Sequence, residues 1–366
     1  MRITRIDCTP VTFPMRTTLA FAAGQMTASE HVLIQVHTDE GLTGTAEAPS
    51  RPYLYGESQR SMIAAAERWF APALIGTDPF GIEAAWETLD RVAHNNTIKG
   101  ALDLALHDII GQALGIPCHR LLGGYATSAR VTYVCGHAPP AAMADEALAM
   151  AAAHGIDAFK LKVGFDPRED AEMVRVMRRA LPDALLYLDG NEAFRAQDAI
   201  RFLRIAEENG IAWIEEPCAV PDRAGRRQIA RAANVPVLGD ESCQRPEDVA
   251  REIADGTVHM VSIKLARSGY RNARSILGAC AASRVRPMVG SQGDSGVGVL
   301  AALHFCVAHR ATQALPAELS FFLNLGSDLL AEPLVIRGGR LQATDAPGLG
   351  IAIDPGKLAQ CRADRV

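Results

Sequence analysis

The sequence predicts an α/β protein, a (β/α)7β barrel of the TIM type with an α+β capping domain. Two observations predict this fold. Short apolar strand patterns recur at a nearly constant spacing from about residue 130 onward, and antiparallel strand patterns followed by helical patterns precede them. The length of 366 residues exceeds the size at which one hydrophobic core usually stops growing. We expect a capping domain over 1–125, a barrel over 126–325 and a C-terminal segment, 326–366, that returns to the capping domain.

The capping domain is predicted from the alternation of apolar and polar residues. This alternation occurs over 2–14 and 31–38 and resumes after a turn at Asp39-Glu40-Gly41, which predicts an antiparallel meander. Apolar residues at helical spacing follow over three segments, and the last ends at a glycine. These helical segments are 58–74, 79–94 and 98–115.

The barrel is predicted from eight strand candidates. They cover residues 131–136, 158–164, 185–191, 212–217, 235–242, 260–266, 286–292 and 313–320. From the second candidate on, landmarks at their C-terminal ends fall 27, 26, 25, 24, 26 and 27 residues apart. One strand and one helix per period is the repeat of a parallel βαβ unit, and eight such strands favour a closed barrel. The tail pattern over 334–343 predicts a further strand pair about a Gly-Gly turn.

Composition excludes several classes of protein. The chain is 48% hydrophobic and 22% charged, and no apolar run is long enough to cross a bilayer. Its first residues alternate like a strand, unlike a signal peptide, so we expect a cytoplasmic protein. The eight cysteines are scattered without a C-x-x-C pair, which indicates reduced thiols. A net charge of −5 argues against nucleic acid and membrane surfaces, so the expected partner is a small molecule.

The scarcity of lysine narrows the search for catalytic residues. Of 37 basic residues only five are lysines, namely Lys99, Lys160, Lys162, Lys264 and Lys357. Of the two basic side chains, only lysine can release its proton near neutral pH. A lysine at a strand end is therefore a candidate for acid/base chemistry.

The strand ends carry an ordered set of charged residues. Barrel enzymes place catalytic groups where the strands end, and alternation points Lys160 and Lys162 the same way. Asp189, Glu215 and Asp240 end the next three strands, and Lys264 ends the sixth. Converging carboxylates repel one another unless a cation neutralises them, and oxygen ligands suit Mg²⁺ or Mn²⁺.

This set predicts proton transfer next to a substrate carboxylate. The cation would act as a Lewis acid on that carboxylate and stabilise the enolate formed from it. Lysines with pKa values lowered by the metal and by burial would add or remove the α-proton.

Other acidic residues have weaker interpretations. Asp294, after strand seven, and Glu318, at the end of strand eight, could contact substrate or serve the fold. Glu216 and Glu241 are expected to point away from the barrel mouth because their neighbours point into it.

Together the strand-end motifs resemble those of the enolase superfamily, muconate lactonizing enzyme subgroup. The motifs are Lys160-Leu161-Lys162, Asp189-Gly190-Asn191, Glu215-Glu216-Pro217, Asp240-Glu241-Ser242 and Lys264. The resemblance implies Mg²⁺ or Mn²⁺ on Asp189, Glu215 and Asp240, acid/base work by Lys162 and Lys264, and a homo-oligomer. It also implies that Lys160 binds the substrate carboxylate and depresses the pKa of Lys162, and that Asn191 supports the substrate or a ligand.

Within this subgroup, residues 31–59 and 289–298 are similar to actinobacterial cis,cis-muconate cycloisomerases. That resemblance implies conversion of muconate to muconolactone, in which a lysine, with Lys264 preferred to Lys162, protonates the α-carbon of an enolate. Loops around Leu19–Met26 and Arg51–Tyr55 would close over the substrate, with Tyr53 or Tyr55 in contact with it.

Other functions stay open. The same two lysines could run a racemase or epimerase of N-acyl amino acids, or a dehydratase. The segment after strand seven lacks the histidine of mandelate racemases, and the end of strand eight lacks the Asp-x-Asp of dipeptide epimerases. A Schiff-base aldolase using Lys264 or Lys162 leaves the three acids unexplained, and a silent binding protein would bind ligand without turnover.

Overall fold

The computed structural model of this protein describes residues 1–22 and 24–364. Its larger part is a parallel sheet of seven strands in the order β11-β10-β9-β8-β7-β6-β5. The strands are β5 (Tyr133–Cys135), β6 (Ala158–Lys162), β7 (Leu185–Asp189), β8 (Ile214–Glu215), β9 (Val237–Gly239), β10 (Met260–Lys264) and β11 (Arg286–Gly290).

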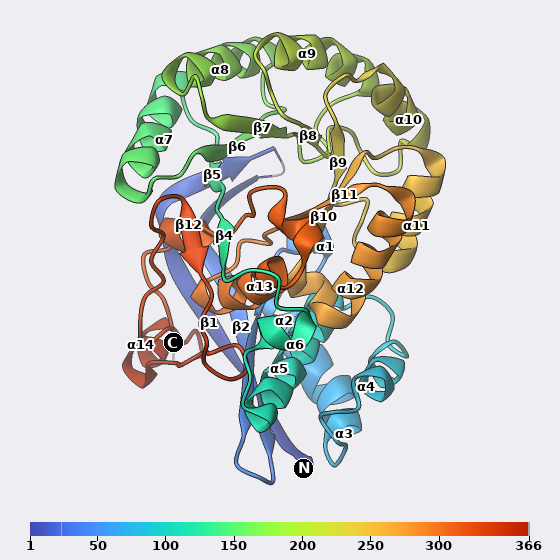
Figure 1. The fold of residues 1–366 in the computed structure, drawn as a ribbon, viewed down its shortest axis with the longest axis vertical. Helices are drawn as coiled ribbons and strands as arrows, with labels where there is room; N and C mark the ends of the chain where they lie inside the picture. The colour runs from blue at the N-terminus through green and yellow to red at the C-terminus, as the bar shows by residue number, and fades with distance from the viewer. Residues whose placement is uncertain (23, 365–366) are drawn as a thin grey trace.

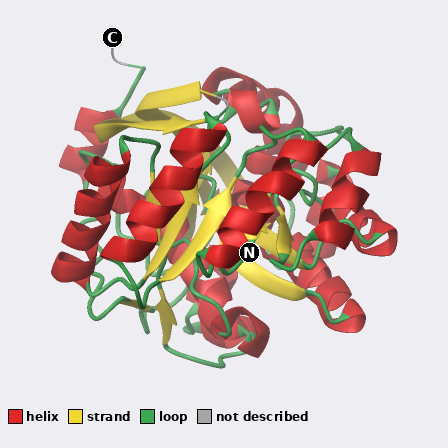
Figure 2. Cartoon of the chain, turned by 90° about the horizontal axis from the view of Figure 1, so that it is seen from above, coloured by secondary structure: helices red, strands yellow, loops and turns green. Residues whose placement is uncertain are grey.

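Helices alternate with these strands and form an outer arc (Figure 1). They are α7 (Pro140–His154), α8 (Pro167–Ala180), α9 (Ala196–Glu208), α10 (Arg223–Ala232), α11 (Pro246–Asp255), α12 (Leu265–Ser283) and α13 (Gly296–Ala308). Viewed from above in Figure 2, helices surround the central strands. Apolar side chains of both layers fill the space between them, so the sheet is buried on its outer face.

A short segment completes the barrel between β11 and β5. The Ala317 amide donates to the Arg130 carbonyl at 2.8 Å, and the Thr132 amide donates to the Ala317 carbonyl at 2.8 Å. On the other side, the Glu318 amide donates to the Val289 carbonyl at 3.0 Å. The predicted eighth strand, 313–320, is therefore present as a few bonded residues around Ala317, between a 3-10 turn at Arg310–Gln313 and another at Phe321–Asn324. The predicted barrel is confirmed.

The capping domain begins with an antiparallel sheet in the order β1-β2-β3, as predicted. Its strands are β1 (Ile3–Phe21), β2 (Gly24–Thr38) and β3 (Thr43–Pro49). Its helices are α1 (Pro52–Tyr55), α2 (Gln59–Ala65), a π-helical turn (Ala66–Phe70), α3 (Ala71–Leu74), α4 (Ile82–Leu89), α5 (Asn96–Leu114) and α6 (Cys118–Leu122). The β1–β2 hairpin reaches the barrel, where the His137 amide donates to the Ala20 carbonyl at 2.9 Å (Figure 1).

The C-terminal segment differs from the prediction in its pairing. Strand β12 (Arg340–Gln342) pairs with β4 (Ser128–Arg130), not with 334–337 as a hairpin. Gly338 and Gly339 do form a turn, but it closes a single bridge. Helix α14 (Pro355–Cys361) then packs near β1, and the Ala363 amide donates to the Pro10 carbonyl at 3.0 Å. The predicted domain limits at 125 and 325 stay a prediction.

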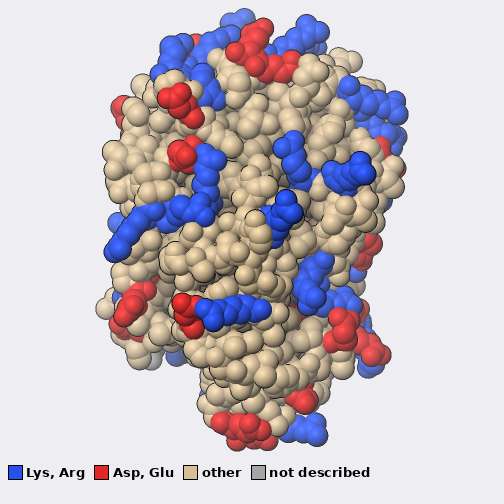
Figure 3. Space-filling model, viewed as in Figure 1, with Lys and Arg blue, Asp and Glu red and all other residues tan. Residues whose placement is uncertain are grey.

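The cysteines, the hydropathy of the helices and the surface charge complete the description of the fold. All eight cysteines are free. Among the helices that the structure describes, none is long and apolar enough to cross a membrane. On the face drawn in Figure 3, basic and acidic side chains are interspersed with uncharged surface and form no continuous basic band.

Candidate active site

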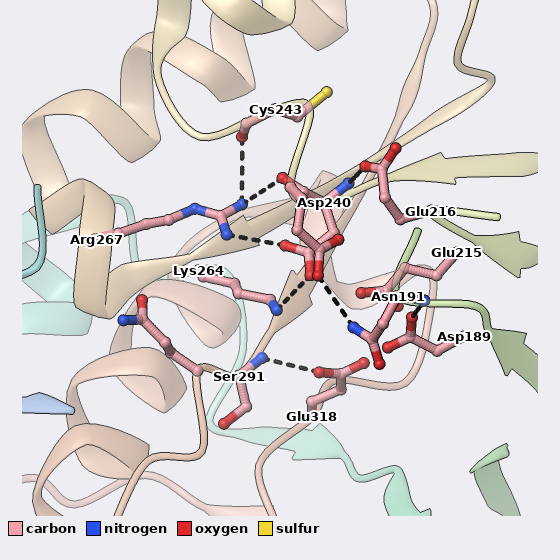
Figure 4. Close-up of polar contacts among 12 residues, drawn as sticks. Asp189, Asn191, Glu215, Glu216, Asp240, Cys243, Lys264, Arg267, Ser291 and Glu318 are labelled. Atoms are coloured by element: carbon pink, nitrogen blue, oxygen red, sulfur yellow. Dashed lines mark hydrogen bonds and ion pairs between the residues drawn. The ribbon is translucent and has the colours of Figure 1, made fainter. Parts of the chain in front are cut away.

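The predicted strand-end residues meet at one level of the barrel. In the parallel register Lys162 pairs with Asp189, and Asp189 pairs with Glu215. Asp240 directly follows β9, and Lys264 ends β10. All are buried, and Figure 4 shows the acidic side chains directed toward the same centre as Lys264.

Lys160 lies among three carboxylates. Its Nζ is 2.9 Å from Asp189 Oδ2, 2.8 Å from Glu215 Oε2 and 2.8 Å from Glu318 Oε1. Burial alone would lower the pKa of Lys160, but these carboxylates outweigh it and raise the pKa well above its ordinary value. Lys264 behaves alike: burial would lower its pKa, but Asp240 and Tyr55 outweigh this effect and raise the pKa well above its ordinary value. Among the protein side chains alone the pKa of both lysines is raised, and the expected lowering by a bound metal stays a prediction.

Lys162 is held by hydrogen bonds to two residues of the next strand end. Its Nζ donates to Asp189 Oδ2 at 2.7 Å and to Asn191 Oδ1 at 2.6 Å. The Asn191 amide group donates in turn to Glu241 Oε1 at 3.0 Å. Glu241 is absent from the cavity lining and pairs with Asn191, because the turn after Asp240 brings its side chain to this amide.

Lys264 and Arg267 share Asp240 and Tyr55 as partners. Lys264 Nζ donates to Asp240 Oδ2 at 2.6 Å and to the Tyr55 hydroxyl at 3.1 Å. Arg267 Nη1 donates to Asp240 Oδ1 and to the Tyr55 hydroxyl, both at 2.9 Å. Burial would raise the pKa of Asp240, but Lys264 and Arg267 hold it far below its ordinary value. Sequence reasoning missed Arg267.

One cavity joins the acid/base positions to the capping domain. Both predicted loops contribute to its wall, although residue 23 of the first loop lies outside the described residues. The lining residues include Leu19, Phe21, Met26, Arg51, Leu54, Tyr55, Lys160, Lys162, Asn191, Lys264 and Glu318. Tyr53 is 81% exposed and does not line this cavity, so the structure retains only Tyr55 as a contact candidate.

Glu318 and Asp294 take different positions. Glu318 lines the cavity and accepts hydrogen bonds from Tyr187 Oη at 2.8 Å and the Ser291 amide at 2.9 Å. Asp294 accepts a 2.7 Å bond from Ser291 Oγ and is not part of the lining. Burial raises the pKa of Asp294 to about 6.

Glu216 faces away from the cavity, as predicted. Its carboxylate pairs with Arg226 and accepts bonds from the Asp240 amide at 2.7 Å and the Ser242 amide at 3.0 Å. These contacts fix the turn that carries Asp240.

Comparison with known proteins decides the family. The family model "Mandelate racemase / muconate lactonizing enzyme, N-terminal domain" matches residues 4–123, and "Enolase C-terminal domain-like" matches 142–357. The chain belongs to the mandelate racemase/muconate lactonizing enzyme family. The predicted membership of the enolase superfamily, muconate lactonizing enzyme subgroup, is thus confirmed.

Relatives within this family differ in activity. A muconate lactonizing enzyme from Mucobacterium Smegmatis, solved with muconolactone, is 38% identical, with a TM-score of 0.98 and full coverage of both chains. Muconate cycloisomerase 1 of Rhodococcus opacus is 29% identical over 97% of this chain and 96% of that protein. A dipeptide epimerase from Enterococcus faecalis, solved with Mg and a dipeptide, is 27% identical, with a TM-score of 0.91 over 96% of this chain and 100% of that one.

Enzymes of the mandelate racemase/muconate lactonizing enzyme family bind a divalent metal, and the acidic residues here fit one. In the described ranges no three acidic, His or Cys side chains already stand at metal-binding spacing, since ammonium groups lie between the carboxylates. Glu215 nevertheless keeps a buried Oε1 that has no hydrogen-bond partner among the described residues. Burial raises the pKa of Glu215 well above its usual range, and neighbouring carboxylates add to this effect. Such an uncompensated oxygen suits a hard cation.

Proposed function

We propose that this family member is a cis,cis-muconate cycloisomerase that converts muconate to muconolactone. The observation that carries the proposal is the pair of lysines on one cavity. Lys162 and Lys264 end β6 and β10, which are separated in the sheet by the three strands that lead to the acidic residues. Both lysines line the cavity, so each can reach a substrate carbon from a different side.

Asp189, Glu215 and Asp240 would hold the divalent metal, Mg²⁺ or Mn²⁺. When bound, this ion supplies Lewis-acid stabilisation of negative charge on the substrate carboxylate. The fit rests on three buried oxygen donors at neighbouring strand ends and on the unpartnered oxygen of Glu215.

The side chains of the cavity then perform the proton transfer. Lys160 attracts one substrate carboxylate. An oxygen of the other carboxylate adds to the double bond conjugated with the first, and the π electrons of that double bond form an enolate of the carboxylate beside Lys160. Lys264 gives a proton from Nζ to the α-carbon of that enolate, which completes the lactone. Asp240 and Tyr55 hold this Nζ at 2.6 and 3.1 Å, so the ammonium is oriented before substrate binds. Lys162 would serve the opposite face.

Similarity to the lactonizing enzyme solved with muconolactone supports this substrate, because it extends over the whole of both chains. A second candidate function is racemisation or epimerisation of an N-acyl amino acid or a dipeptide. The similar fold of the dipeptide epimerase favours it, and two lysines on one cavity also suit removal and return of an α-proton.

Proton NMR of cis,cis-muconate with the Mg²⁺-loaded protein in D₂O tests the proposal. We expect muconolactone carrying one deuterium, and the labelled face identifies the lysine that acts. Untouched muconate, with deuterium instead entering an N-acyl amino acid or a dipeptide, would reverse the assignment in favour of the racemase or epimerase. Borohydride trapping of a substrate adduct would indicate a Schiff-base aldolase, and ligand binding without any turnover would indicate a silent binding protein.

Variants at the two lysines separate their roles. Lys264→Met should reduce lactone formation roughly 100-fold or more, as expected for loss of a general acid. Lys357→Met on α14 is the matched control, since this lysine donates to the Leu330 carbonyl and does not line the cavity. Full activity of Lys264→Met together with an inactive Lys162→Met would move the acid to Lys162.

A further inference from the structure

Arg51 is a buried cation in the cavity wall with no role in the proton transfer. It directly precedes α1, in the capping domain, and its side chain is 6% exposed. It lines the same cavity as Lys160 and Lys264 but comes from the capping domain, whereas both lysines come from the barrel. Burying a guanidinium is costly unless its charge is compensated.

Within residues 1–22 and 24–364, the hydrogen-bond partners of Arg51 are all neutral groups. Nη1 donates to the Ser50 carbonyl at 2.5 Å, and Nη2 donates to Ser29 Oγ and to the Gly293 carbonyl, both at 2.8 Å. Among the residues that the structure describes, no carboxylate forms an ion pair with it, although Asp294 and Glu47 act on it from farther away. Burial lowers its pKa to about 10, so the guanidinium stays charged at neutral pH.

The fold holds this guanidinium in place from both domains. Ser29 Oγ is bonded to His31 Nε2 at 2.7 Å, and His31 Nδ1 lies 3.2 Å from Glu47 Oε2. Gly293, in the loop after β11, has φ +85°, and a Cβ there would lie 2.3 Å from Arg51 Nη2. Only glycine allows this approach, so the barrel loop and the capping domain together fix Arg51.

The wall around Arg51 is otherwise largely apolar. The apolar residues of the lining are Leu19, Phe21, Met26, Leu54, Val134 and Phe321. A ligand that fills this cavity would contact the lysines at the strand ends of the barrel with one end. Its middle would contact apolar side chains, and its other end would contact Arg51 of the capping domain. This distribution matches a molecule with an anionic group at each end and an apolar middle.

We propose that Arg51 binds the second carboxylate of the substrate and so makes the enzyme specific for dicarboxylates. This inference rests on the proposed function, in which the first carboxylate of the substrate binds beside Lys160 at the strand ends of the barrel. Three of the five N–H donors of the guanidinium are bonded to protein in the described part of the chain, which leaves donors for an anion.

Calorimetric titration of the Mg²⁺-loaded protein with adipate and with hexanoate tests this role without turnover. Both are saturated six-carbon acids that cannot lactonize, and they differ only in the second carboxylate. We expect wild type to bind adipate roughly 30-fold or more tightly than hexanoate, as for one buried charge pair. Arg51→Gln should remove this preference and leave hexanoate affinity unchanged, and Arg51→Lys should keep part of it.

The control variant is Arg60→Gln, which changes an exposed arginine on α2 of the same domain and should keep the preference. Thermal unfolding of each variant checks that the fold is intact. Equal binding of the two acids by wild type, or a preference that survives in Arg51→Gln, would overturn the inference. Loss of the preference in Arg51→Gln supports it even if muconate is not turned over, in which case only the muconate assignment fails.

Discussion

Asp294 is a buried carboxyl group whose charge is poorly compensated. It is 4% exposed, and its Oδ1 has no hydrogen-bond partner in the part of the chain that the structure describes. Burial, together with the nearby Glu47, raises its pKa to about 6 against the opposing effects of the Ser291 hydroxyl, the Gln292 amide and Arg51. Ionised Asp294 therefore costs stability at neutral pH.

The sign of the pH dependence follows from this shift. The folded pKa lies above the unfolded value, so the stability from this group is full below about pH 4 and is lost as pH rises through 6. Asp294→Asn removes the titration. Between pH 5 and 8 the wild type should lose roughly 1 kcal/mol of unfolding free energy relative to this variant, as urea unfolding would measure. If the unfolding free energies of the wild type and the variant change equally with pH, the raised pKa does not belong to Asp294.

The functional residues could be predicted where their residue type is rare in this chain and where they recur at the strand ends of the repeat. Lysine is scarce in this chain, and its strand-end positions, together with those of the three acids, followed from the repeat. Arg267 stayed hidden because arginine is the common cation here, and Arg51 was placed in a loop over the substrate without a role of its own. The choice of Tyr55 over Tyr53 depends on the direction of the single turn α1, which the sequence alone does not set.

Helix α5 packs so closely on the start of α12 that only glycine fits between them. A Cβ on Gly100 would lie 2.3 Å from the carbonyl oxygen of Ala266, two residues after Lys264. Gly100→Ala must therefore push the two helices apart. We expect a loss of about 1–3 kcal/mol in urea unfolding and a fall in turnover, since Lys264 moves with the start of α12.

The matched substitution for this test is Gly278→Ala, in helix α12, against which α5 packs. Gly278 has nothing within 4 Å of an added Cβ, so alanine should stabilise the protein by about 0.5–1 kcal/mol and leave turnover unchanged. If the two variants unfold at the same urea concentration, close packing at Gly100 does not matter to stability.

Elements inside the repeat were predictable because each strand and helix must span the same barrel. The errors lie where that repeat ends. The eighth strand shrinks to the residues that bond Arg130 and Val289, and β12 finds its partner in β4, more than 200 residues earlier. Such pairing depends on distant chain segments, and no local pattern around 334–343 contains it.

At the scale of the whole molecule, the capping domain and the barrel meet around the charged cavity. Tyr55 contacts Lys264 and Arg267, and Arg51 contacts Gly293, so both contacts join α1 and the residue before it to barrel strand ends. Substrate specificity and catalysis thus depend on the packing of one domain on the other. Assembly into a homo-oligomer stays a prediction.

The buried carboxylates make the stability of the whole protein dependent on a divalent cation. Asp189, Glu215 and Asp240 come from three strands, so a cation that bridges them links those strands in the folded state only. At 100 times its dissociation constant such a ligand adds about 2.7 kcal/mol. We expect Mg²⁺ to raise the melting temperature of the wild type and EDTA to reverse this rise.

Glu215→Gln should remove the stabilisation of the folded protein by Mg²⁺. Without metal the variant should be at least as stable as the wild type, because a neutral amide replaces a buried carboxylate that has an unpartnered oxygen. With Mg²⁺ the wild type should gain stability and the variant should not. Glu208→Gln, at an exposed position of α9, should respond to Mg²⁺ like the wild type. An equal response of Glu215→Gln would show that the ion acts elsewhere, because only a site that includes Glu215 loses its cation when this carboxylate is removed.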